Sequence, residues 1–274
     1  MEPPAGHAAG AVDTEVVEGP FTFRQEAETT RRILEALSVV PDLRARLDRA
    51  SRAHRSLGST AVLDAKSRLA PDLVSMVSTL LTVSVDHLGA WQSLISHGYQ
   101  PNIAHLTLLR SAMETAVTGR WLMDPTIGRE GRIARTAGLL LADYGHRERF
   151  ETAFGIPPPK PPAKLAAARI ADLRQLLAAE GVRPTDVPKP TALFDRFCIP
   201  SGPRGSAVYN MLSGFAHGRQ WVALLQEVRR VADKLGGGAM SVVTSRDDVT
   251  VVVTGVAVRV VTVAVAEYET YIGV

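Results

Sequence analysis

Apolar side chains recur at every third or fourth position along most of this chain, the spacing of an α-helix with one buried face. The longest such pattern covers residues 70–96 and ends at a stretch that contains Gly98 and Pro101. The same spacing predicts further helices that begin near 23 and 41, that cover 103–123, 129–150, 164–179 and 192–197, and that run from 206 beyond 218. The pattern therefore predicts a mainly all-α fold, a multi-helix bundle.

One segment near the C-terminus departs from this spacing. Two short runs rich in valine, Met240–Thr244 and Val249–Val253, are joined by the polar residues 245–248. Short β-branched runs around a polar turn are typical of a hairpin. We therefore expect a small β-hairpin, followed by a last helix over 254–272.

Composition at the ends and in the middle of the chain suggests how it is divided. Residues 1–22 are rich in Pro, Gly, Ala and acidic residues and show no period, so we expect a disordered tail. Residues 23–274 then form a single helical domain. Within it, the proline-rich stretch 155–190 is expected to be a connector or insertion, and the sequence leaves open whether it covers a site.

Composition and charge indicate where the protein is located and which partners it can bind. The chain of 274 residues is 46% hydrophobic with a net charge of only +3, which gives a sizeable core and no strong basic field. Its single cysteine, Cys198, fits a reducing compartment. No secretory signal pattern opens the sequence, and the apolar run 249–265 is interrupted by Arg259. We expect a cytoplasmic protein that does not enter a membrane.

The expected helix over 103–123 carries the first pair of charged residues beside a core face. Arg110 and Glu114 lie four positions apart, so their side chains can meet, and Trp121 continues the apolar stripe. A pair beside the core is either an internal clamp that fixes helix packing or the lining of a site. Both interpretations stay open at this stage.

The expected helix from 206 carries a second polar strip. Tyr209, Ser213 and His217 recur every four residues and therefore share one helical face. A histidine near neutrality can act as an acid–base group or contact a phosphate, and a neighbouring serine can be its partner. The alternative is a buried ladder of hydrogen bonds between helices.

Several common chemistries lack their signatures. No GxSxG elbow is present, and the glycines at 236–238 are not followed by the Lys-Ser/Thr of a phosphate loop. Paired Glu-x-x-His motifs of dinuclear metal sites are absent. We therefore expect no metal and no cofactor. Arg129, Arg132 and Arg135 line one helical face, which is usually a solvated surface and only weakly suggests RNA binding.

The two expected helices with polar residues together resemble the pattern of a known protein family. An Arg-x-x-x-Glu helix followed by a tryptophan, then a helix with Tyr-x-x-x-Ser-x-x-x-His, resembles a bacterial all-helical family described as a domain of unknown function. Its pattern, over residues 70–235, is distantly similar to the HEPN superfamily. HEPN nucleases use an Arg and a His separated by four to six residues on one helix, whereas upstream of His217 this spacing offers Asn210 and Met211. The nuclease pair would be rebuilt only if Arg110 met His217 across the bundle.

Three hypotheses follow from the sequence. The resemblance favours a HEPN-like protein, dimeric or larger, that binds nucleic acid or a nucleotide in stress response or phage defence. The alternatives are a non-catalytic, dimeric interaction module and an enzyme that acts on a small-molecule ligand in a cavity between helices. We assign the candidate site residues as catalytic, His217, Ser213, Arg110 and Glu114, and as ligand-binding, Tyr209, Asn210 and Trp121.

Overall fold

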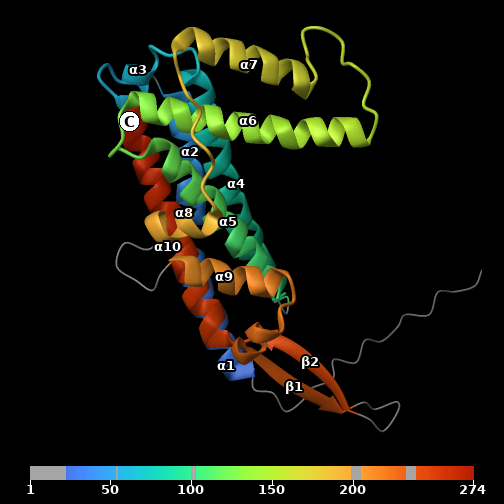
Figure 1. Cartoon of the computed structure of the whole chain (residues 1–274). Helices are drawn as coiled ribbons and strands as arrows, with labels where there is room; N and C mark the ends of the chain where they lie inside the picture. Colours follow the sequence, from blue (N-terminus) through green and yellow to red (C-terminus); the bar gives the residue numbers. More distant parts are fainter. Residues whose placement is uncertain (1–22, 54, 100, 102, 199–204, 233–238) are drawn as a thin grey trace, which may run out of the picture.

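Three long helices run side by side along the molecule and form its centre (Figure 1). They are α4 (Ala70–Ser96), α5 (Ala104–Met123) and α10 (Asp247–Ile272). The computed structural model describes residues 23–53, 55–99, 101, 103–198, 205–232 and 239–274. The expected disordered tail, residues 1–22, lies outside the described residues.

Shorter helices cover this central layer. The helices α1 (Phe23–Leu37), α2 (Val40–Arg52) and α3 (Thr60–Asp64) pack on α10 and α4. The helices α8 (Pro190–Phe197) and α9 (Gly205–Ala216) pack on α5. The described residues are mostly helical, and their buried side chains form one continuous core, so the expected all-α bundle is confirmed.

Two helices project sideways from one end of the bundle. These are α6 (Arg129–Ala153) and α7 (Ala166–Glu180), which lie against each other (Figure 1). The proline-rich stretch 155–190 therefore contains a helix of its own. The segment after this helix, residues 181–189, crosses α6, and we call it the strap. Its Thr185 amide donates to the Ala134 carbonyl of α6 at 3.0 Å.

The expected hairpin of Met240–Thr244 and Val249–Val253 is wrong. Residues 249–253 belong to the first turns of α10, where Thr250 and Val253 are buried. Valine favours strands through packing on a half-buried surface, and here burial against α5 and α1 fits a helix instead. Before α10 come a 3₁₀ turn η1 (Gln220–Leu225) and two short paired antiparallel strands, β1 (Gln226–Ala232) and β2 (Ala239–Ser245).

Charged hydrogen bonds fix α10 among its neighbours. Two arginines on other helices make paired contacts with its glutamates: Arg46 with Glu269 at 2.9 and 2.6 Å, and Arg120 with Glu267 at 2.7 Å for both contacts. Parallel contacts of this kind set direction as well as distance. They therefore hold α10 in register with α2 and α5.

By length and composition, α4 and α10 are also apolar enough to cross a membrane. This is weak evidence, because a core helix of a bundle passes the same test. The absence of a membrane contact and the cytoplasmic location stay predictions.

Candidate functional site

The first group of candidate residues meets between α5 and α9. Arg110 Nη2 donates to the Tyr209 hydroxyl at 2.8 Å, and the guanidinium lies 4.9 Å from the centre of the tyrosine ring. Phe194 of α8 contacts the same ring edge-on at 5.0 Å. The structure therefore joins Arg110 and Tyr209, which are 99 positions apart in the sequence.

The carboxylate partner in this group is held less closely. Arg110 Nε lies 3.5 Å from Glu114 Oε2, and this buried nitrogen makes no hydrogen bond within the described part of the chain. The Arg110 side chain is 18% exposed and that of Glu114 34%. A half-buried guanidinium with a weakly held acid and a tyrosine can position helices or accept an anion.

The second half of the expected site does not join this group. Helix α9 ends at Ala216, and Gly218 with φ +60° turns the chain away, so His217 lies beyond the helix and is exposed. Its amide donates to the Ser213 carbonyl at 3.0 Å. Among the described residues, no side-chain contact links His217 with Ser213 or Arg110. The roles of Ser213 and His217 stay predictions.

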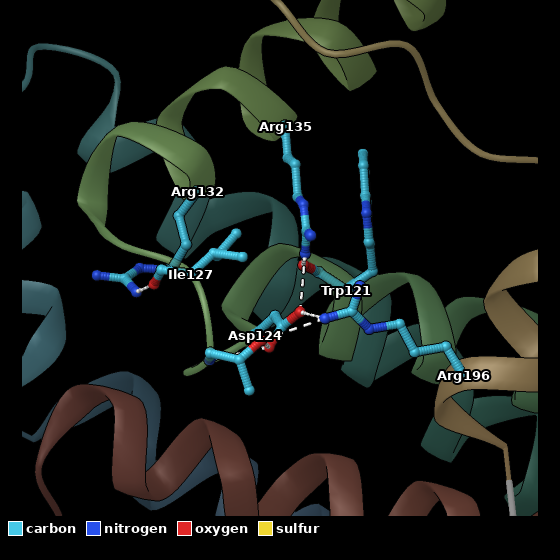
Figure 2. A network of polar contacts seen from close by, with 7 residues as sticks. Trp121, Asp124, Ile127, Arg132, Arg135 and Arg196 are labelled. Carbon is cyan, nitrogen blue, oxygen red and sulfur yellow. Dashed lines mark hydrogen bonds and ion pairs between the residues drawn. The ribbon is translucent and has the colours of Figure 1, made fainter.

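Trp121 and Asn210 lie apart from this group. Trp121 is 3% exposed, and its ring is covered by the guanidinium of Arg135 at 5.2 Å (Figure 2). Arg135 donates to the Trp121 carbonyl at 2.6 Å. Asn210 is exposed on α9. Trp121 is therefore placed in the core rather than at a surface where a ligand could reach it.

The network around Trp121 centres on one buried acid. Asp124, 2% exposed, accepts from Arg135 at 3.2 Å and from Arg196 at 2.6 Å (Figure 2). Although burial raises the pKa of the Asp124 carboxyl, hydrogen bonds from Thr126, then the contact with Arg135, hold it below its usual value. This network joins α5, α6 and α8.

A cavity with a different character lies beside the first turns of the same helix, α6. It has a volume of about 780 Å³, within the range of small-molecule sites. We call it the cationic cleft, and it is lined by Lys66, Ser67, Arg68, Arg129, Glu130, Gly131, Ile133, Ala134, Glu180, Gly181, Val182 and Arg183. These residues come from the segment before α4, the first turns of α6 and the end of α7.

Positive charge predominates in the cationic cleft. Its four cations are Lys66, Arg68, Arg129 and Arg183. All four are exposed, and within the described ranges no ion pair involves any of them. Arg68 and Arg129 lie near enough to Glu180 to help lower its pKa, but neither forms a described ion pair with it. Exposed cations gathered in a concave site attract an anion, and arginine matches the geometry of phosphate and carboxylate.

The two acids of the cleft offset only part of this charge. Glu180 accepts from the Ser67 hydroxyl at 2.7 Å and from the Arg68 amide at 2.9 Å. The Ser67 hydrogen bond is the main reason that the pKa of Glu180 is lowered, although burial opposes it. Glu180 thus stays ionised and ties α7 to the start of α4, while Glu130 lies in the first turn of α6.

The start of α6 adds to the positive potential of the cleft. Its N-cap is Gly128, which has no side chain to accept from the free amides of the first turn. Those amides and the helix dipole favour negative charge nearby. The backbone therefore acts in the same direction as the four cations.

The sequence pattern grouped Arg129 with two arginines that have other partners. The interpretation of Arg132 and Arg135 as a solvated face is wrong. Arg132 is 6% exposed and contacts Asp64, and Arg135 contacts Asp124. Only Arg129 lines the cleft. Because Lys66 and Arg183 are far from it in the sequence, no spacing could have indicated the cluster.

The fold and the cleft define an all-α helical bundle with a candidate anion-binding site. No protein-family model, curated protein or solved structure matches this chain. The similarity to HEPN proteins therefore stays a prediction.

Proposed function

We propose that this protein binds a nucleic acid or a nucleotide through its phosphate groups in the cationic cleft. The observation that carries the proposal is the cluster of four cations without described ion pairs in a cavity of about 780 Å³. An Arg–phosphate contact is a charge-assisted hydrogen bond, which is stronger than a neutral one. The proposal keeps the ligand class that the sequence favoured but moves the site from α9 to the cleft.

The exposure of the cations sets the expected binding behaviour. Hydrated surface charges are screened by salt over about 10 Å at 0.1 M ionic strength. Binding is therefore expected to weaken steeply as salt increases, as it does for ligands held by phosphate contacts. We do not assign cleavage to the cleft, because its one hydrogen-bonded hydroxyl–carboxylate pair, Ser67 with Glu180, ties α7 to the segment before α4 and Ser67 is buried.

The test is titration calorimetry of the full chain with ATP and with a ten-nucleotide single-stranded RNA. Arg129→Gln/Arg183→Gln removes two cleft charges, and we expect affinity for the phosphate ligand to fall by about tenfold or more. The control Arg49→Gln/Arg174→Gln removes two exposed arginines elsewhere and leaves the same net charge. Equal losses in both double variants, or no binding by the wild type, would contradict the proposal.

A second candidate function is self-association through the outer face of α10. The observation that favours it is an outward row of small and apolar residues, Val252 (63% exposed), Gly255 and Ala266, which a single exposed charge, Arg259, interrupts. Apolar faces of this kind often pack on a second copy. Light scattering should then give about twice the 29.4 kDa mass of the chain, and Val252→Lys should restore the single mass. A single mass for the wild type excludes this candidate.

A further inference from the structure

A second cavity opens beside the cationic cleft and is lined by residues at the start of α4, on α6 and on α7. Its volume is about 540 Å³. We call it the inner pocket, and it is lined by Arg68, Leu69, Asp72, Leu140, Tyr144, Arg169, Asp172, Leu173, Gln175, Leu176 and Ala179. Arg68 lines both cavities. Ala179, which lines the inner pocket, directly precedes Glu180, which lines the cationic cleft, so the two cavities adjoin.

The inner pocket differs from the cleft in its chemistry. Leu69, Leu140 and Leu173 form a buried apolar floor. Above it the charges balance, because two arginines face two aspartates, one of which, Asp172, contacts Lys164 at 2.5 Å. Most of the other lining residues are polar or charged, so the leucines can contact the face of a flat ring while the polar groups bind its edge.

Tyr144 supplies an aromatic surface in this pocket. It is half-buried on α6, and the Arg169 guanidinium lies 6.0 Å from its ring centre. Flat bases stack on aromatic rings and on guanidinium planes. Tyr144 is the single aromatic residue among those lining either cavity, so there is one stacking surface rather than a row of them.

From these two adjoining cavities we propose that the ligand is a mononucleotide, with its phosphate in the cationic cleft and its base in the inner pocket against Tyr144. This inference rests on the proposed phosphate-binding function and makes it more specific. A single-stranded nucleic acid needs repeated stacking surfaces along a basic groove, and the described cavities offer one. The structure thus favours a nucleotide over RNA.

Two carboxylates fix the orientation of this ligand. Asp72 and Asp172 line the inner pocket and can accept from an amino group on a base, whereas the cationic cleft has the excess of positive charge that favours the phosphate. Desolvation raises the pKa of the Asp72 carboxyl, and the nearby Arg169 acts against this shift. The amino group of adenine is therefore a suitable partner on the probe.

The experiment compares four probes by calorimetry on the full chain: AMP, ribose 5-phosphate, inorganic phosphate and the ten-nucleotide RNA. We expect AMP to bind about tenfold more tightly than ribose 5-phosphate, because only AMP carries a stacking base. Tyr144→Leu should remove most of this difference and leave the affinity for ribose 5-phosphate unchanged. Phe150→Leu, on the same helix but outside both cavities, is the matched control.

The outcomes separate this inference from the function on which it rests. Equal affinities for AMP and ribose 5-phosphate, or tighter binding of RNA than of AMP, overturn the mononucleotide proposal and leave phosphate binding standing. If none of the four probes binds, phosphate binding itself fails. Thermal melting of Tyr144→Leu checks folding, and Asp72→Ala, which should also lower AMP affinity selectively, tests the pocket without removing an aromatic residue.

Discussion

Asp64 shows how much of the stability of this bundle depends on single buried charges. It is fully buried and accepts from Arg132 at 2.8 and 2.7 Å and from the Tyr271 hydroxyl at 2.9 Å. These contacts join α3, α6 and α10 at the end of the molecule that carries the cationic cleft. Arg132 itself is 6% exposed, and Asp64 is the carboxylate with which it forms its described ion pair. Asp64 therefore balances the buried charge of Arg132.

Removing this acid should destabilise the fold severely. Asp64→Ala leaves the buried Arg132 charge without its partner, and such changes cost about 3–5 kcal/mol. The control is Asp86→Ala, which breaks an ion pair with Arg44 at 3.5 Å whose side chains are 59% and 79% exposed. That change should cost less than about 1 kcal/mol. Urea unfolding measures both, and similar losses would contradict this account.

His105 makes stability depend on pH. It is fully buried, stacks on Trp91 at 4.8 Å, and contacts the Pro101 carbonyl at 2.9 Å and the Thr250 hydroxyl at 3.1 Å. Burial lowers the pKa of His105 from 6.5 to about 4, although the Pro101 contact opposes this. Between these pH values the unfolded chain binds a proton that the folded chain does not.

The contribution of His105 to stability is therefore complete above pH 6.5 and is lost as pH falls towards 4. The free energy of unfolding should fall by about 1.4 kcal/mol per pH unit from this group alone. In His105→Gln, the difference in stability between pH 7 and pH 5 should be smaller than in the wild type by about 2 kcal/mol. Urea titrations at the two pH values test this, and an unchanged difference would show that His105 is already protonated in the fold.

For single residues, the sequence predicted contacts within a helix better than contacts between helices. The four-residue spacing of Arg110 and Glu114 correctly predicted that they could meet. It could not show that Tyr209 would complete the group, because the two residues come from different helices. The spacing of Ser213 and His217 assumed a helix that continued past Gly218, which α9 does not.

The strap packs closely against α6, and a glycine on α6 makes this contact possible. Gly138 lies where an added Cβ would overlap the Thr185 carbonyl oxygen. Gly145, two turns further along the same helix, has open space, with the nearest atom of another side chain, Arg149 Nη1, at 3.9 Å. The two glycines thus form a matched pair.

Alanine should have opposite effects at these two positions. Gly138→Ala must displace the strap, at a cost of about 1–3 kcal/mol. Gly145→Ala only improves helix propensity and should stabilise by up to about 1 kcal/mol. Differential scanning calorimetry compares their melting temperatures. A rise in both would mean that the strap is not held against α6.

The helices of the core were largely predictable, and the end of the chain was not. Residues 70–96 have a regular apolar spacing, and α4 has those bounds. Residues 249–265 are so rich in valine that helical spacing and strand propensity give conflicting indications. The contacts of α10 with α5 and α1, which are long-range, decide the conflict.

At the scale of the whole molecule, the cationic cleft is assembled from three separate segments. Lys66 precedes α4, Arg129 begins α6 and Arg183 follows α7. Each is an ordinary exposed cation in the sequence, and only the antiparallel packing of α6 and α7 on the start of α4 brings them together. A net charge of +3 gave no sign of this local concentration.

The site of the nucleotide can be located by photo-crosslinking of 8-azido-ATP to the full chain, with labelled peptides mapped by mass spectrometry. We expect saturable labelling of peptides from 66–72, 129–144 and 169–183, reduced by competing AMP. Labelling of 104–123 and 205–219 instead would place the ligand at Arg110 and Tyr209. That result, or labelling that does not saturate, would contradict the assignment of the nucleotide site to the cationic cleft.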